Sequence, residues 1–254
     1  MQFCGENGIL TARLGGEILR IEPWGKDSLR VRATRFSKFT DQDWALIETP
    51  AVVESGEEDH WVGDGTIDKK EIASITNGRI KAVVNFRGII TYYRDGKQFL
   101  REYFRFYDGT LCKESRCLKV VNREWKGVIG GSEYQLNVKF ESNDGEKIFG
   151  MGQYQQHELD LKGCMLELAQ RNSQVSVPFY LSSIGYGFLW NNPGVGQVMF
   201  ANNGTEWVTE SGKEIDYLVI AGDTPAEIEE NYMTLTGKPP MMPEYGMGYW
   251  QCKL

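Results

Sequence analysis

The sequence lacks the features of a nucleic-acid-binding protein and of a membrane protein. Lys and Arg number 28 against 35 Asp and Glu, which gives a formal net charge of −7. Because binding to a phosphate backbone needs a basic face, and the Lys and Arg do not cluster, we expect no nucleic-acid partner. No apolar run approaches the roughly 18 residues that span a bilayer, so we also expect no insertion into a membrane.

Cysteine and histidine are scarce and irregularly spaced. With an odd number of cysteines we expect free thiols in a reducing compartment, with disulfides as the alternative. The two histidines, His60 and His157, do not complete a zinc site. The first residues show neither the basic segment nor the apolar run of a signal peptide, so we expect a cytoplasmic protein without a metal or another cofactor. The five cysteines are Cys4, Cys112, Cys117, Cys164 and Cys252.

Short β-rich runs separated by turn residues dominate the chain. Asn77-Gly78 and Asp95-Gly96 tolerate positive φ and lie between such runs, so residues 71–103 predict an antiparallel meander. Alternating apolar and polar residues predict a hairpin over 17–34 and a strand over 134–141. Further strands are expected over 118–125, 197–201, 205–209 and 215–221. About twelve strands with frequent turns predict an all-β antiparallel sandwich.

One helix is well marked near the end of the chain. Thr224 is placed as its N-cap, Pro225 as its first residue, and Glu227 as the partner of Thr224 in a capping box. Gly237 ends it. We therefore expect a β-sandwich domain over 1–236, a Pro-rich linker over 237–243 and a buried strand over 244–254. A linker that leads to a single strand suggests a chain cut from a longer protein.

The stretch 148–196 begins and ends as strand, and between lie about thirty residues with neither strand nor helix period. Long irregular loops in compact domains are uncommon and tend to be functional. Because an apolar strand follows it directly, we expect the loop to be held in place and to form a binding surface. Its polar residues are Gln153, Tyr154, His157, Glu158, Asp160, Gln170, Arg171 and Asn172.

Several motifs in this order resemble the amino-terminal region of glycoside hydrolase family 31, the α-glucosidases and α-xylosidases. The wording of Trp190-Asn-Asn-Pro and Trp250-Gln-Cys-Lys is closer to the α-xylosidase-like members. The resemblance covers nearly the whole chain and is clearest over 148–254. The other motifs that carry it are Phe149-Gly-Met-Gly-Gln, Leu161-Lys-Gly, Gln170-Arg-Asn, Pro178-Phe-Tyr-Leu, Gly185-Tyr-Gly-Phe-Leu, Thr224-Pro-Ala-Glu and Pro243-Glu-Tyr-Gly-Met-Gly-Tyr.

The resemblance implies a galactose-mutarotase-like β-sandwich followed by a (β/α)8 barrel, of which 244–254 looks like the first strand. A barrel needs about 250 residues, which this chain does not supply. In the family, an Asp nucleophile and an Asp acid/base lie on later barrel strands. The chain therefore has no catalytic residue of its own and is expected to be inactive alone, with the missing catalytic barrel of the same chain as its partner. The implied substrate is an α-glycoside oligosaccharide.

The resemblance also implies that the irregular loop reaches over the barrel mouth. Asn172, with Arg171 beside it, matches the position of a sugar-contacting residue that is Asp in many relatives. An amide suits sugar hydroxyls because it both donates and accepts hydrogen bonds. The alternative for Asn172 is a turn residue before a strand. Trp250 and Gln251 are the other candidate substrate-binding residues, because the ends of barrel strands point at the active site.

Other interpretations remain open. Glu158 and Asp160 suit acid/base chemistry or simply a solvated loop. Two functions from other classes are a stand-alone carbohydrate-binding module and, with less support from only two histidines, an aldose mutarotase. Four aromatic residues suit sugar stacking or an ordinary core: Trp24, Trp125, Tyr186 and Trp190. The apolar residues Tyr245, Met247, Tyr249 and Trp250 are expected to promote a homo-oligomer if they lack a partner.

Overall fold

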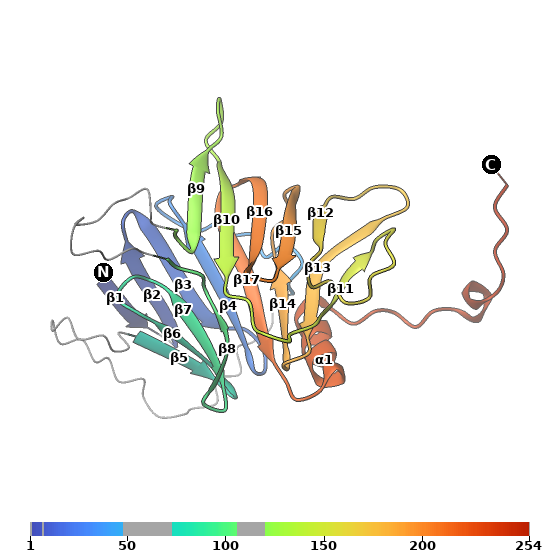
Figure 1. The fold of residues 1–254 in the computed structure, drawn as a ribbon, viewed down its shortest axis with the longest axis horizontal. Coiled ribbons are helices and arrows are strands. Elements are labelled where there is room, and N and C mark those ends of the chain that lie inside the picture. Colours follow the sequence, from blue (N-terminus) through green and yellow to red (C-terminus); the bar gives the residue numbers. More distant parts are fainter. Residues whose placement is uncertain (1, 7, 48–72, 106–119, 254) are drawn as a thin grey trace.

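A computed structural model describes residues 2–6, 8–47, 73–105 and 120–253. Three antiparallel sheets, helix α1 (Pro225–Thr236) and the short 3-10 helix η2 (Glu244–Met247) make up the regular structure of these residues (Figure 1). The prediction of an all-β sandwich with one C-terminal helix is confirmed. Among the residues named above, His60, Cys112 and Cys117 lie outside the described ranges.

The eight-stranded sheet joins segments that are far apart in the sequence. Its central pair is β4 with β17, in register from Glu214↔Thr34 to Ile220↔Ser28. The predicted hairpin over 17–34 is confirmed as β3 and β4, whereas β1 and β2 were not predicted from the sequence. The strand order is β1 (Gln2–Glu6), β2 (Ile9–Leu14), β3 (Glu17–Pro23), β4 (Ser28–Thr34), β17 (Glu214–Ala221), β14 (Tyr186–Trp190), β13 (Val175–Ser182) and β11 (Ile148–Gln153).

A five-stranded sheet lies against it, and aromatic side chains fill the space between. Trp207 lies 5.6 Å from Trp190 and 5.3 Å from Phe188, measured between ring centroids. Trp190 and Tyr186 are buried in this core, so they do not stack on sugars. The order of the sheet is β12 (Met165–Leu168), β15 (Gly196–Ala201), β16 (Gly204–Gly212), β10 (Tyr134–Phe140) and β9 (Arg123–Gly127).

The predicted meander forms the third sheet, and its turn at Asn77-Gly78 docks on the sandwich. Asn77 Nδ2 donates to the carbonyl oxygens of Gly25 (2.7 Å) and Ser28 (2.8 Å). The amide of Arg79 donates to Asp27 Oδ1 at 2.7 Å. A local turn signal thus also specifies a tertiary contact. The four strands are β5 (Ala73–Asn77), β6 (Ile80–Val84), β7 (Ile90–Arg94) and β8 (Lys97–Arg101).

Helix α1 begins and ends where the sequence predicts. The hydroxyl oxygen of Thr224 accepts from the Glu227 amide at 3.2 Å, but the Glu227 carboxylate accepts from the amide of Asp223 instead of that of Thr224. The expected capping box is therefore wrong in its second bond. The helix packs on β14 closely enough that a Cβ on Gly187 would lie 2.6 Å from Ile228, which explains the glycine there.

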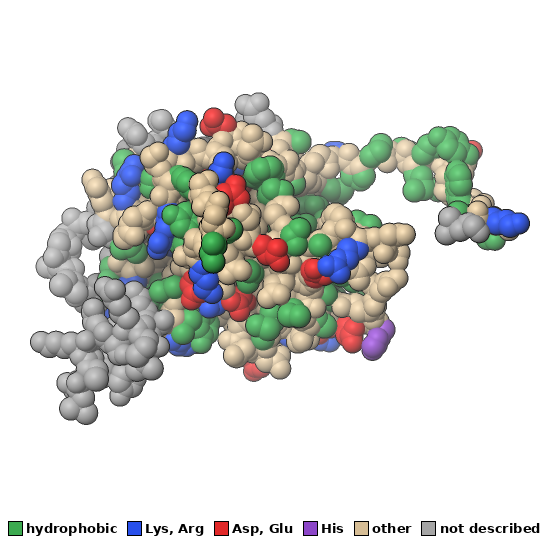
Figure 2. All heavy atoms as spheres, turned by 90° about the horizontal axis from the view of Figure 1, so that it is seen from above, with side chains coloured by type: hydrophobic (Ala, Val, Ile, Leu, Met, Phe, Trp, Pro, Cys, Tyr) green, Lys and Arg blue, Asp and Glu red, His purple; other side chains and the backbone are tan. Residues whose placement is uncertain are grey.

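Residues 237–253 lead away from the sandwich (Figure 1), and no described residue of 248–253 lies in a strand. The expected strand over 244–254 does not form over the described residues 244–253, which consist of η2 and irregular backbone. Strands form when neighbouring strands supply hydrogen-bond partners, and 244–253 has none in this structure, so its place in a barrel stays a prediction. Figure 2 shows hydrophobic side chains along this tail. Exposed among them are Met241, Met242, Tyr245, Met247, Tyr249 and Trp250.

Candidate functional site

The loop between β11 and β13 connects the two sheets of the sandwich. β11 and β13 pair within the eight-stranded sheet, while β12 inside the loop pairs with β15 of the five-stranded sheet. The prediction of about thirty irregular residues is therefore wrong over Met165–Leu168 and over Val175–Ser182, which form β12 and β13. Four alternating residues are too short a pattern to distinguish a strand from a loop in the sequence. The loop is anchored at its ends and in its middle.

Glycine permits the close approach of β11 to the end of the loop. Gly152 has φ +94°, and a Cβ there would lie 2.8 Å from the amide nitrogen of Val177 and still closer to the carbonyl oxygen of Val175. Gly150, with φ +110°, is similarly close to Phe179. Both glycines belong to the Phe149-Gly-Met-Gly-Gln motif, so this motif has a structural role: it holds the strand from which the loop leaves.

The side chain of Gln170 closes the turn that carries Arg171 and Asn172. Its Nε2 donates to the carbonyl of Ser176 at 2.8 Å, and its Oε1 accepts from the amide of Ser176 at 3.1 Å. The hydroxyl of Tyr154 lies 2.8 Å from Ser176 Oγ and 2.9 Å from the carbonyl oxygen of Glu167. These bonds fix both ends of the turn, so its exposed side chains are held on a rigid base.

Arg171 and Asn172 lie together in a shallow hollow of about 450 Å³ formed by Gln170–Val175. Arg171 forms an ion pair with Glu167, whereas the Asn172 amide has no hydrogen-bond partner among the described residues. Trp250 and Gln251 are exposed in the tail, where Trp250 Nε1 donates to the Gly246 carbonyl at 3.3 Å. Among the described residues no contact joins them to the loop. The structure thus brings together two of the four predicted site residues.

The carboxylates of the loop have ordinary surface roles. His157 Nε2 lies 3.3 Å from Glu158 Oε1 on the surface. Although slight burial opposes it, hydrogen bonds from the Ile148 and Lys162 amides hold the pKa of Asp160 below its ordinary value. An acid with a lowered pKa is a poor proton donor near neutral pH, so Asp160 serves to cap the turn and does not suit the role of a general acid.

The described residues hold no group of three or more His, Cys, Asp and Glu that could bind a metal ion. Within the same ranges, no helix has both the length and the apolar character needed to cross a bilayer. Cys4, Cys164 and Cys252 are free thiols.

Trp24 and Trp125, the two remaining candidates for sugar stacking, also pack on protein. Trp125 Nε1 donates to Glu17 Oε2 at 2.8 Å, and the Trp24 ring lies 4.6 Å below the Arg30 guanidinium. Sequence reasoning did not select Trp44, an exposed tryptophan with 49% of its surface accessible to solvent. No periodic pattern marks residue 44, so only the structure identifies it.

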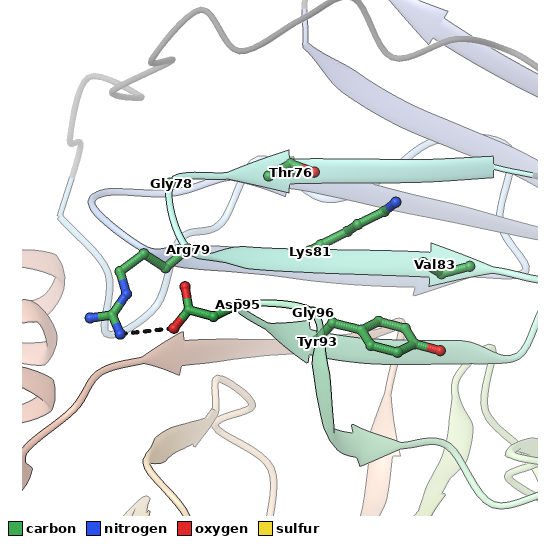
Figure 3. A pocket seen from close by; sticks show the side chains of 8 residues that line it. All are labelled: Thr76, Gly78, Arg79, Lys81, Val83, Tyr93, Asp95 and Gly96. Carbon is green, nitrogen blue, oxygen red and sulfur yellow. Dashed lines mark hydrogen bonds and ion pairs between the residues drawn. The ribbon is translucent and has the colours of Figure 1, made fainter.

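A further hollow of about 420 Å³ lies on the outer face of the meander sheet (Figure 3). The register places Thr76, Lys81 and Tyr93 side by side on adjacent strands. At its rim Arg79 pairs with Asp95 at 3.0 Å. Arg79 also pairs with Asp223 at 2.7 Å, so the charge at this rim is already neutralised.

Comparison with known proteins gives a consistent set of relatives, although no family model matches. An uncharacterized family 31 glucosidase of Pseudescherichia vulneris is 46% identical over 251 residues, which are 95% of this chain and 45% of that protein. Alpha-xylosidase A of Aspergillus niger is 29% identical, over 99% of this chain and 35% of its own length. This chain therefore spans less than half the length of these relatives.

Solved structures agree. The crystal structure of a family 31 α-xylosidase from a soil metagenome, complexed with xylose, is 44% identical and superposes with a TM-score of 0.86 over 99% of this chain and 37% of that one. A xylosidase from Aspergillus niger gives a TM-score of 0.74 at 25% identity, over 94% of this chain. By sequence and by fold, the chain belongs to glycoside hydrolase family 31 and corresponds to the amino-terminal portion of these enzymes.

Proposed function

We propose that this chain is the N-terminal β-sandwich domain of a retaining α-glycosidase, an α-xylosidase or α-glucosidase that hydrolyses α-linked glycosides. The observation that carries the proposal is the 44% identity and TM-score of 0.86, over 99% of this chain, to an α-xylosidase complexed with xylose. The domain lends the loop Gln170–Val175 to the substrate pocket, and a catalytic barrel of the same polypeptide supplies the chemistry.

The described loop supports a binding role and not a catalytic one. Retaining hydrolysis needs two carboxyl groups about 5 to 5.5 Å apart across the scissile bond, one of them protonated at the start. Asp160 is held ionised by backbone amides, and Glu158 pairs with His157 in the solvent. The chain alone is therefore inactive in this proposal, and residues 244–254, with Trp250 and Gln251, begin the barrel.

Asn172 is the residue proposed to touch the sugar. Its amide is exposed, lacks a partner among the described residues and stands on a turn closed by Gln170. One amide both donates to and accepts from vicinal hydroxyls, as sugar recognition requires. Arg171 lies beside it, with part of its charge neutralised by Glu167.

A chimera tests the proposal. This chain replaces the matching portion of the soil-metagenome α-xylosidase, and hydrolysis of nitrophenyl α-xyloside and α-glucoside is measured for the chimera and for the 254-residue chain alone. We expect turnover by the chimera and none by the chain alone. Turnover by the chain itself would contradict the assignment of the chemistry to a barrel, and a well-folded but inactive chimera would contradict the domain assignment.

Asn172→Ala in the chimera tests the loop. Loss of a neutral hydrogen bond is worth about 0.5–1.5 kcal/mol, so we expect kcat/KM to fall about 2- to 12-fold, mainly through a higher KM. The control is Asn202→Ala, which alters an exposed asparagine in the turn between β15 and β16. Kinetics that are the same for Asn172→Ala and for the control would remove Asn172 from the substrate pocket.

Two further proposals concern the cellular location and the oligomeric state of the protein. A cytoplasmic location is supported by the free thiols of Cys4, Cys164 and Cys252. A homo-oligomer of this chain is supported by the exposed Tyr249 and Trp250, and sedimentation of the chain with and without residues 241–254 measures it. An aldose mutarotase is not proposed, because His157 has only the solvated Glu158 beside it.

A further inference from the structure

A cavity of about 320 Å³ lies at the end of the sandwich where β14, β16 and β17 meet the segment 40–44. It shares no residue with the turn Gln170–Val175. We propose that this cavity binds a neutral oligosaccharide, with one pyranose ring stacked on Trp44. Its lining residues are Thr40, Gln42, Trp44, Glu133, Asn192, Pro193, Gly194, Ser211, Gly212, Lys213 and Glu214.

The backbone around Trp44 is fixed in an unusual conformation that presents the indole to solvent. Trp44 has φ +53°, in the left-handed region that bulky residues seldom occupy. Asn191 ties down both neighbours of Trp44: its Nδ2 donates to the Asp43 carbonyl at 3.1 Å, and its Oδ1 accepts from the Ala45 amide at 3.2 Å. A strained residue held by its surroundings is a reason to look for function.

The anchors of this turn are themselves buried. The Asp43 carboxylate accepts from Arg30 Nη1 at 2.6 Å, and the Arg30 side chain is fully buried. Asn191 is buried as well, and its Nδ2 also donates to Asp216 at 2.8 Å. The exposed ring of Trp44 is therefore mounted on a rigid polar network, which lowers the entropic penalty of binding a ligand against it.

The walls of the cavity are also preformed. The Glu214 carboxylate accepts from the amide of Thr40 at 2.9 Å and from its hydroxyl at 2.8 Å. Asn192 Nδ2 donates to the Glu214 carbonyl at 3.1 Å, and its Oδ1 accepts from the Gly194 amide at 3.2 Å. These groups hold the shape of the cavity and are not themselves free for a ligand.

Three lining side chains remain available to a ligand. The Gln42 amide, the Lys213 ammonium and the Trp44 indole have no interaction with another side chain in the described part of the protein, and all three are exposed. Together they offer an apolar ring face, hydrogen-bond donors and an acceptor. An apolar face beside a few polar groups that fix orientation is typical of small-molecule sites, and sugars combine C–H faces with hydroxyls.

The volume of the cavity and the charges that line it restrict the class of ligand further. A volume of about 320 Å³ is at the lower end for ligand pockets, which suits one or two sugar rings with the remainder outside. The lining carries Glu133 and Glu214 against Lys213, with Glu133 already bound to Ser211, so no strong field of one sign favours a charged ligand. A neutral oligosaccharide fits these properties better than a phosphate or a peptide carboxylate.

The test is direct binding to the 254-residue chain. Isomaltotriose, maltotriose and xylotriose are titrated by calorimetry and by tryptophan fluorescence. We expect saturable millimolar binding of at least one of them and an affinity at least about tenfold lower in Trp44→Gly, the order expected for loss of a stacked ring (about 1.4 kcal/mol per tenfold change). Glycine suits φ +53°, so this variant deletes the ring without straining the turn. Trp44→Phe keeps a ring and should retain most of the affinity.

Two controls separate this cavity from other surfaces. Phe86→Ala removes another exposed aromatic ring, and Asn202→Ala alters an exposed asparagine in the turn between β15 and β16; neither residue lines the cavity. Both should bind as the unmodified chain does. The proposal is overturned if none of the three sugars saturates, if Trp44→Gly binds normally, or if either control loses binding. These outcomes are independent of the chimera, which tests the domain assignment by turnover.

Discussion

At the scale of single residues, Arg30 is a buried cation that depends on its anionic partners. Its guanidinium is fully buried and donates to both carboxylate oxygens of Asp216, at 3.1 and 2.7 Å, and to Asp43 at 2.6 Å. Burial raises the pKa of Asp216 to about 6, against the opposing pull of Arg30 and Asn191. A buried pair of this kind depends on both partners, because either one alone is an unpaired charge in the interior.

Arg30→Met is predicted to destabilise the chain by about 3–5 kcal/mol at pH 7.5, because Asp216 is left buried without its cation. The pKa of Asp216 should then rise further above about 6. A raised folded-state pKa stabilises the protein at low pH, and this contribution is lost as the pH rises through the pKa. The difference from the unmodified chain should therefore shrink between pH 7.5 and pH 5 in urea unfolding.

The control for this experiment is Arg79→Met. Arg79 pairs with Asp95 and Asp223 on the surface, where salt bridges contribute little. We expect almost no change in its unfolding midpoint at either pH. A pH-independent loss of stability in Arg30→Met would show that the variant acts through lost packing and not through the charge of Asp216.

At the scale of elements, helix α1 illustrates how a local signal is joined to the sandwich. Its N-cap bond from the Glu227 amide to Thr224 is specified by neighbours in the sequence. Its position is specified by packing: the ring of Tyr232 stacks on Phe179 of β13 with centroids 3.9 Å apart, and Ile228 meets Gly187 of β14. The amide of Ile47 also donates to the Leu235 carbonyl at 2.9 Å, so the helix supports the segment beyond Trp44.

Thr224→Ala is predicted to lower the free energy of unfolding by about 1 kcal/mol, because the Glu227 amide loses its acceptor at the helix start. The matched control is Thr234→Ala, an exposed position in the last turns of the same helix, where alanine has the higher helix propensity. We expect the control to be neutral or slightly stabilising in urea unfolding. Equal effects of the two substitutions would contradict a capping role for Thr224.

At the scale of the whole molecule, Glu102 joins the three sheets. It follows β8 of the meander sheet, and its fully buried carboxylate accepts from Arg123 of β9 at 2.6 and 2.7 Å. The same carboxylate accepts from the hydroxyl of Tyr217, on β17 of the eight-stranded sheet, at 3.2 Å. Arg123 also pairs with Glu17 of β3 at 2.8 Å. One ionic network thus connects segments more than one hundred residues apart.

Glu102→Ala is predicted to destabilise the chain by about 3–5 kcal/mol, since it breaks a buried ion pair at this junction. Because all three sheets meet there, the unfolding curves from tryptophan fluorescence and far-ultraviolet circular dichroism should shift together. The control is Glu141→Ala, which removes the partner of the exposed Arg105 and should change stability by less than about 1 kcal/mol. A shift in only one of the two curves would mean that the sheets unfold separately.

Local chemistry explains which parts of the fold were predictable. The turns at Asn77-Gly78 and Asp95-Gly96 and the ends of α1 depend on residues within one turn of each other, so their patterns are visible in the sequence. β12 was not predicted, because four alternating residues are too few to distinguish a strand from a loop. The choice of Arg171 and Asn172 as candidate site residues follows from a family resemblance. The side-chain bonds of Gln170 that hold their turn are visible only in the structure.

The sequence by itself determined the class of the fold, the presence of most strands, the helix and its cap, and the family, because each depends on short-range pattern or on a motif. Only the tertiary structure decided that β4 pairs with β17, that Glu102 joins three sheets, and that Trp44 stands exposed beside a cavity. The physical reason is distance along the chain. Hydrogen bonds and ion pairs between residues 100 to 190 positions apart leave no periodic trace in the sequence, although the bonds of Asn191 and Arg30 set the position of Trp44.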